Sequence, residues 1–168
     1  MPPLSPPRLL IVDDHTVIRL CARVTLQHAW PGCVVEEAGS VQQARNLLAA
    51  RTYDLMLLDV HLPDGVGIDL AQAPAGRPHR IPAVAMSSDR TPDTLLACAN
   101  AGLDTLLDKP LQAVELVRAV SRHLPSPPHW PSATAAMMQD SPEISHDVTS
   151  RRSAPSAHLC HHLPPRRG

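Results

Sequence analysis

Five short apolar runs along the middle of the chain constrain its fold more than any other feature of the sequence. They begin near residues 9, 33, 55, 81 and 105. Each run is too short for a buried helix, and most lack the polar alternation of a strand with one wet face. Such runs are typical of strands buried on both faces of a parallel sheet. Because helix-like stretches lie between them, the pattern predicts a doubly wound α/β domain with helices on both faces.

Local signals favour helices between these strands. Ser40 followed by Gln43 is a capping box, and Thr91 followed by Pro92 is typical of a helix start. Pro74 is expected to keep the third helix short. Residues at helical spacing predict the first and last helices. In the first helix these residues are Val17, Leu20, Cys21, Val24 and His28. In the last helix they are Val114, Val117, Val120 and Leu124.

Proline and polar residues divide the chain into a folded middle and two tails. Residues 1–7 include four prolines and are typical of a Pro-rich tail. Residues 8–124 form the predicted globular domain. Residues 125–168 include eight prolines with many Ser, His and Arg residues, and they show no helix-turn-helix periodicity. We expect both tails to be disordered and no output domain to follow the globular one.

Composition excludes several classes of protein. The net charge is -1 and the chain has two Trp, one Tyr and no Phe, which argues against a basic nucleic-acid clamp and against an aromatic platform for single strands. No apolar stretch is long enough to span a membrane and no signal peptide is evident, so we expect a cytoplasmic protein. The His-rich stretch at 158–162 matches no structural zinc template. Four cysteines form no CxxC pair and are expected to be reduced thiols; they are Cys21, Cys33, Cys98 and Cys160.

Polar residues close four of the five apolar runs. Asp13 and Asp14 follow the first run, Asp59 the third, Ser87 the fourth and Lys109 the fifth. Each residue alone has an ordinary explanation as a turn, a cap or a surface charge. However, ligands of open α/β sheets bind beyond the carboxyl ends of the strands, so we expect these side chains to meet. Lys109 is the one lysine among 15 basic residues, which favours a need for a compact ammonium there.

Carboxylates crowded at one sheet edge repel each other, and a divalent cation usually balances them. Oxygen ligands without His or Cys nearby favour Mg²⁺ over zinc. A carboxylate held beside Mg²⁺, with a lysine and a hydroxyl across from it, suits phosphoryl transfer to an aspartate. The sequence therefore predicts an aspartate that accepts a phosphoryl group.

Four segments of the predicted domain carry a specific resemblance. They are RLLIVDDHTVIR, DLMLLDVHLPDGVGIDL, IPAVAMSSD and AGLDTLLDKPL. Together they resemble the receiver domain of two-component response regulators over residues 8–124. The resemblance implies a flavodoxin-like, five-stranded parallel sheet of order 2-1-3-4-5. In that order the acidic residues lie side by side.

The resemblance also implies roles for individual residues. Asp59 is the implied phosphoryl acceptor. Asp14 is the implied direct Mg²⁺ ligand, with Asp13 supporting the ion through water. The main-chain carbonyl of His61 is the implied further metal ligand. Ser87 occupies the position of the family's switch hydroxyl.

The remaining implications concern Lys109 and the partners. Lys109 would pair with the phosphoryl group, and its bond to Pro110 would be cis. A histidine kinase or a phosphotransfer protein would donate the phosphoryl group, and the aspartyl phosphate would then hydrolyse partly by the domain's own catalysis. Phosphorylation would draw Ser87 and Lys109 inward and bias the face of the fourth helix, fifth strand and fifth helix toward a downstream protein. Leu106 departs from the family, which usually has Tyr or Phe there.

Two other functions stay open at this point. One is a Mg²⁺-dependent phosphohydrolase with an aspartyl nucleophile, but such enzymes place the nucleophile after the first strand, whereas the isolated Asp59 follows the third. The other is a degenerate receiver that docks proteins without phosphate, which Leu106 favours and the intact acidic site opposes. We therefore predict a stand-alone phosphoacceptor switch rather than an enzyme, with no nucleic-acid or membrane partner.

Overall fold

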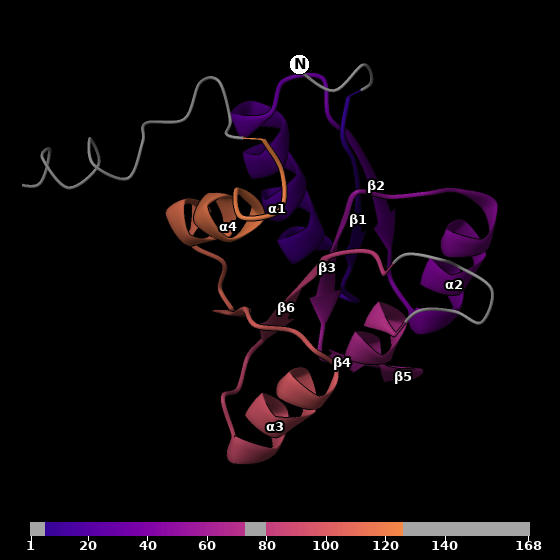
Figure 1. Ribbon diagram of the computed structural model, residues 1–168, viewed down its shortest axis with the longest axis vertical. Coiled ribbons are helices and arrows are strands. Elements are labelled where there is room, and N and C mark those ends of the chain that lie inside the picture. The colour runs from indigo at the N-terminus through magenta and orange to yellow at the C-terminus, as the bar shows by residue number, and fades with distance from the viewer. Residues whose placement is uncertain (1–5, 73–79, 126–168) are drawn as a thin grey trace, which may run out of the picture. The chain divides into compact units, whose positions relative to one another are not determined.

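The central feature of the fold is a five-stranded parallel sheet (Figure 1), seen in a computed structural model that describes residues 6–72 and 80–125. Its strands are β1 (Arg8–Val12), β2 (Val34–Ala38), β3 (Leu55–Asp59), β6 (Ala83–Ser87) and β7 (Leu106–Asp108). They lie in the order β2-β1-β3-β6-β7, which is 2-1-3-4-5 when the strands of this sheet alone are counted. The predicted fold class is therefore confirmed.

The central strands are buried, as their apolar runs predict. Every residue of β3 and β6 is buried, and in β1 only Arg8 is partly exposed. Strand β2 lies at one edge of the sheet, carries Glu36 and Glu37, and is mostly half-buried. The unbroken apolar runs thus reflect strands that helices cover on both faces.

Helices cover both faces of the sheet in the part of the chain that the structure describes. They are α1 (Thr16–Ala29), α2 (Val41–Ala50), α3 (Pro92–Asn100), α4 (Ala113–Val120) and the 3-10 helix η1 (Gly67–Ala71). Helices α1 and α4 pack on one face, over strand residues that include Leu9 and Leu57. Helix α2 and η1 pack on the other face, over Leu10 and Met56. Successive strand residues therefore serve opposite layers of the core.

Two predicted helix starts are confirmed at the level of hydrogen bonds. The Ser40 hydroxyl accepts a bond from the Gln43 N–H at 3.1 Å, and the Gln43 side chain accepts one from the Gly39 N–H at 2.8 Å. Thr91 caps α3 by accepting a bond from the Thr94 N–H at 3.2 Å, and Pro92 opens that helix. Both caps bind N–H groups that have no partner within the helix.

The connection after β3 differs from the other strand-to-strand connections. It begins with a small antiparallel hairpin, β4 (His61–Leu62) paired with β5 (Gly65–Val66), which the sequence did not predict. The five-residue η1 follows in place of an α-helix, in line with the expected short third helix. Pro74, which motivated that expectation, lies outside the described residues.

The apolar stripe of the first helix predicts the helix correctly but not its buried face. In α1 the side chains of Val17 and Val24 are 70% and 57% exposed. The residues that pack against the sheet are Ala22, Leu26 and Ala29. The buried face thus combines two small alanines with Leu26, and Val17 and Val24 lie on the outside.

The described cysteines are all free thiols. Cys21 is exposed on α1, whereas Cys33 and Cys98 are buried. Burial raises the pKa of the Cys33 and Cys98 thiols, which keeps both neutral at physiological pH. Cys160 and the His-rich stretch at 158–162 lie outside the described residues.

The described part of the chain ends close to the C-terminal end of α1. The Trp30 indole N–H donates a hydrogen bond to the Pro125 carbonyl at 2.7 Å, and Trp30 is 5% exposed. The structure does not describe residues 1–5 and 126–168, so the predicted tails lie almost wholly outside it. Within the described ranges, no helix is long and apolar enough to cross a membrane.

Candidate functional site

The carboxyl ends of neighbouring strands bring the predicted site residues together. Asp13 directly follows β1, Asp59 ends β3, and Lys109 directly follows β7. Asp13 is 0% exposed, Asp59 is 4% exposed, and the Lys109 side chain is 5% exposed. Buried charges of this kind are rare unless they are paired, so their arrangement needs an electrostatic explanation.

Lys109 provides the pairing. Its Nζ lies 2.6 Å from Asp13 Oδ2 and also donates a hydrogen bond to Asp59 Oδ2. The contact with Asp13 is an ion pair without good hydrogen-bond geometry, because Asp13 Oδ2 has no hydrogen-bond partner among the described residues. One ammonium therefore stands between two buried carboxylates.

Backbone N–H groups hold the other oxygen of each carboxylate. The His15 N–H donates to Asp13 Oδ1 at 2.8 Å, and the His61 N–H donates to Asp59 Oδ1 at 3.1 Å. In both cases the donor lies two residues after the aspartate, as in an Asx turn. These bonds fix both side chains and leave the two Oδ2 atoms facing Lys109.

Arg19 holds the backbone at Asp13, a role that the sequence did not reveal. Its guanidinium donates to the Asp13 carbonyl at 2.6 Å and to the Glu37 carboxylate at 3.0 Å. The Asp13 N–H in turn donates to the Ala38 carbonyl at 3.0 Å. Helix α1 and strand β2 thus both anchor the loop that carries the acidic pair.

The acidic residues fit a divalent cation. Ligand atoms of Asp13, Asp14, His15 and Asp59 all lie within 4.8 Å of one another. Three carboxylates face one ammonium there, so a divalent ion would balance the remaining charge. The expectation that no His lies nearby is wrong, because the imidazole of His15 belongs to this group. Its place directly after Asp14 in the sequence was the signal that could have revealed it.

Ser87 lies beside this group but does not bind Asp59. It is 1% exposed, and its hydroxyl accepts a hydrogen bond from the Asp89 N–H at 3.2 Å. Its carbonyl accepts a bond from the Lys109 N–H at 2.9 Å, which fixes the end of β7 against β6. The Lys109–Pro110 peptide bond is cis.

The rim of the site carries a polar pair from two loops. His61 Nε2 lies 3.5 Å from Asp89 Oδ2, and both side chains are well exposed. The Thr94 hydroxyl donates a hydrogen bond to Asp89 at 2.6 Å and thereby lowers the pKa of that carboxyl. Asp89 is therefore a fixed negative charge next to His61.

Gly67 packs directly against the backbone of Asp59. A Cβ built on Gly67 would lie 1.9 Å from the Asp59 carbonyl oxygen and 3.0 Å from the Leu62 side chain. The Gly67 N–H donates to the Val60 carbonyl at 3.0 Å, which closes the loop that contains the β4–β5 hairpin. No motif in the sequence singled this residue out.

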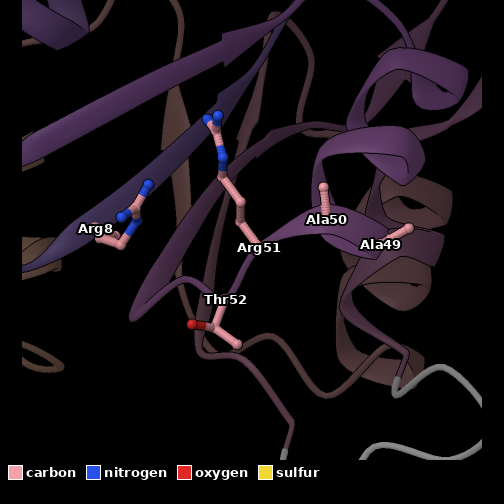
Figure 2. Close-up of a pocket in the computed structure, with 5 residues that line it drawn as sticks. All are labelled: Arg8, Ala49, Ala50, Arg51 and Thr52. Atoms are coloured by element: carbon pink, nitrogen blue, oxygen red, sulfur yellow. The ribbon is translucent and has the colours of Figure 1, made fainter.

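A second concave region lies at the opposite end of the sheet, where β1 and β3 begin. A pocket there has a volume of about 400 Å³. Figure 2 shows the residues that line it, which are Arg8, Ala49, Ala50, Arg51 and Thr52. Both arginines bind Glu36 of the edge strand. Since these charges are already paired, the pocket offers no equivalent of the acidic site.

Comparison with known proteins finds similar sequences over the part of the chain that holds the sheet and the acidic site. The family model of the response regulator receiver domain matches residues 9–121. The two-component response regulator ORR41 of Oryza sativa subsp. japonica is 38% identical over 111 residues, which cover 65% of this chain and 87% of the rice protein. The sensory/regulatory protein RpfC of Xanthomonas campestris pv. campestris is 31% identical over 114 residues, which are 66% of this chain but 15% of RpfC.

Solved structures agree with the fold. The CheY-like receiver domain protein from Methanospirillum hungatei superimposes with a TM-score of 0.62 and 27% identity, over 70% of this chain and 93% of that one. The chain therefore belongs to the response regulator receiver domain family.

Proposed function

We propose that this domain accepts a phosphoryl group on Asp59 from a histidine kinase or a phosphotransfer protein. The observation that carries the proposal is the nearly buried Asp59 carboxylate beside the Lys109 ammonium and the acidic pair Asp13–Asp14. Residues 8–124 form the proposed receiver domain. The relatives named above are regulators, and a receiver domain is generally a phosphoacceptor switch rather than an enzyme.

The proposed metal is Mg²⁺. The carboxylates of Asp13, Asp14 and Asp59 would hold it, with Asp13 acting through water and the main-chain carbonyl of His61 as a further ligand. When bound, the ion supplies positive charge to the phosphoryl oxygens. Oxygen donors of this kind suit a hard divalent cation.

The residues of the chain provide the rest of the chemistry. An oxygen of Asp59 forms the O–P bond while the P–N bond to the donor histidine breaks. The His61 N–H keeps the acceptor carboxylate oriented, and the buried ammonium of Lys109 can move from the carboxylate to the transferred phosphoryl oxygens. Ser87 would turn its hydroxyl from the Asp89 N–H toward the same oxygens.

We propose that the output surface is the face formed by α3, β7 and α4. The helices of this face carry exposed apolar side chains: Leu95 and Leu96 of α3 are 45% and 60% exposed, and Val114 of α4 is 46% exposed. Leu106 lines a pocket of about 190 Å³ on this face, between β7 and α4. The half-buried Leu106 would repack when Ser87 moves, because strands β6 and β7 are neighbours. A downstream protein would bind the changed face. We propose no direct nucleic-acid or membrane partner, and we propose that this takes place in the cytoplasm.

The test is the uptake of a phosphoryl group from acetyl phosphate with Mg²⁺, measured by intact mass. We expect an adduct on the wild type and on the control Asp104→Asn, which changes an exposed loop carboxylate, and no adduct on Asp59→Asn. Lys109→Arg should form less adduct because a guanidinium cannot replace the compact ammonium. A folded wild type without an adduct would leave a phosphate-independent docking module, and turnover of phosphate esters would indicate a hydrolase.

A further inference from the structure

We propose that the imidazole of His15 is a ligand of the metal site and that it gives this site a preference for borderline ions such as Ni²⁺ over Mg²⁺. The inference rests on the metal site of the proposed function, and it adds a nitrogen ligand to a set of oxygens. Imidazole binds transition metals well, whereas Mg²⁺ prefers carboxylate, carbonyl and water oxygens. The identity of residue 15 would thus decide which cation the domain binds.

The spacing of the donor atoms carries the argument. His15 Nδ1 lies 2.8 Å from Asp14 Oδ1 and 3.4 Å from Asp13 Oδ1. Two ligands that each bind a metal at about 2.1 Å are separated by about 3.0 Å at a right angle and by about 3.4 Å at a tetrahedral angle. The 2.8 Å between His15 Nδ1 and Asp14 Oδ1 is close to the right-angle separation, so these two atoms are already spaced as neighbouring ligands of one ion, and Asp13 lies near enough to act through water.

The backbone around His15 ties the imidazole to this position. His15 is the N-cap residue of α1, but its side chain caps no helix N–H. Its own N–H is bound to Asp13 Oδ1 at 2.8 Å, so the residue cannot shift without moving the buried carboxylate. The side chain is 66% exposed, which leaves an ion free to enter from solvent.

His61 provides an internal contrast. It is equally exposed on the same rim, with a side-chain exposure of 64%, but its Nε2 lies against Asp89 and it does not belong to the group of ligand atoms. A general effect of a rim histidine on cation binding would appear in both residues. An effect of coordination would appear in His15 alone.

The simpler alternative is a solvated pair. The short separation between His15 Nδ1 and Asp14 Oδ1 is also what a surface hydrogen bond would give, and such pairs contribute little. The two explanations differ in one respect. A surface pair needs no metal and leaves the cation preference of the site unchanged, whereas a nitrogen ligand couples magnetically to a bound paramagnetic ion.

The experiment uses the full chain loaded with Mn²⁺ at mildly alkaline pH, because protons compete with metal ions for their ligands. Pulsed electron paramagnetic resonance detects ¹⁴N coupling to Mn²⁺, and competition titrations give the affinities for Mg²⁺, Mn²⁺ and Ni²⁺. The variants are His15→Ala, His61→Ala as matched control, and Asp13→Asn to define the acidic site. His61→Ala removes only an exposed side chain and keeps the backbone N–H and carbonyl of residue 61. Residues 158–162 contain three histidines that can bind the same ions, and they are identical in every variant.

Coupling at the acidic site is the ¹⁴N coupling that Asp13→Asn removes. We expect this coupling in the wild type and in His61→Ala but not in His15→Ala. His15→Ala should lose about tenfold in affinity for Ni²⁺ at the acidic site and less than about twofold for Mg²⁺. The inference would be overturned if Mn²⁺ binding depends on Asp13 but His15→Ala has the same spectrum and the same affinities as the wild type. That result would leave the proposed function intact. Binding that Asp13→Asn does not change would overturn both.

Discussion

Lys109 Nζ lies 2.6 Å from Asp13 Oδ2, although nearly the whole domain separates the two residues in the chain. The same ammonium binds Asp59, so one positive charge serves two buried carboxylates. The two carboxylates therefore have two competing partners, the ammonium and a bound cation. The balance between them can be measured through the stability of the domain.

The first prediction concerns Lys109→Met. Without divalent cations, the variant should lose about 3 kcal/mol in the free energy of unfolding, because two buried carboxylates lose their described partner. Added Mg²⁺ should stabilise the variant more than the wild type, since the ion replaces the missing charge. Urea unfolding with and without Mg²⁺ measures both effects.

The matched control for this prediction is Arg118→Met, which removes an exposed positive charge from α4. It should respond to Mg²⁺ as the wild type does. Equal stabilisation of Lys109→Met and wild type by Mg²⁺ would show that ammonium and cation do not share the carboxylates.

The second prediction concerns Gly67→Ala. The new methyl group would meet the Asp59 carbonyl oxygen at 1.9 Å, and a backbone atom in a buried strand cannot move aside. We expect a loss of about 1–3 kcal/mol in urea unfolding, together with slower phosphoryl uptake because the acceptor shifts. Gly39→Ala is the control, since its nearest neighbour would be an Arg19 side-chain atom at 3.6 Å. A neutral Gly67→Ala would mean that the loop can withdraw from Asp59.

The third prediction tests the orientation of α1. Leu26→Ala removes a fully buried side chain and should cost about 2–5 kcal/mol. Val24→Ala changes a side chain that is 57% exposed and should alter stability by less than about 0.5 kcal/mol. Chemical denaturation of both variants measures the difference, and the reverse ranking would contradict the described face.

The fourth prediction is a pH dependence at Asp64. The Gln42 and Val41 N–H groups donate to its carboxylate at 2.9 and 2.8 Å and lower its pKa below the ordinary value of 3.8. Because the folded pKa is the lower one, this contribution to stability is present above the unfolded pKa and is lost as the pH falls through the folded one.

Asp64→Asn should therefore be less stable than the wild type at neutral pH, and the difference should shrink only below pH 3.8. Urea midpoints over a pH series measure it. Asp104→Asn, at an exposed loop residue bound to the adjacent Thr105 hydroxyl, should show no such trend. A difference that is constant down to low pH would contradict the role of the helix N–H groups.

The sequence predicts the sheet well because strands that are buried on both faces consist of apolar residues throughout. Strands β3 and β6 appear as unbroken apolar runs, and helices cover them on each side. The caps at Ser40 and Thr91 were equally predictable, since each depends on residues only three positions apart. Information of this kind is local, so one sequence is sufficient to reveal it.

The features that the sequence did not predict depend on contacts between distant or irregular segments, which the spacing of apolar residues does not reveal. Helix α1 has apolar residues on two sides, and the alanines of the buried side are weaker signals than the exposed Val17 and Val24. The approach of Gly67 to Asp59 depends on a loop whose path no pattern specifies. His15 was missed because its backbone, rather than its residue type, brings it to the carboxylates.

The closure of the loop after Asp59 also limits how this part of the chain can vary. The loop is bounded by Asp59, against which Gly67 packs, and by the hydrogen bond from Gly67 to Val60. Between these points the hairpin pairs His61 with Val66 and Leu62 with Gly65, so each residue has a fixed position. An exposed side chain such as that of Val66 can be exchanged, but an inserted or deleted residue would displace the acceptor itself. This segment therefore has to preserve its length as well as Asp64 and Gly67.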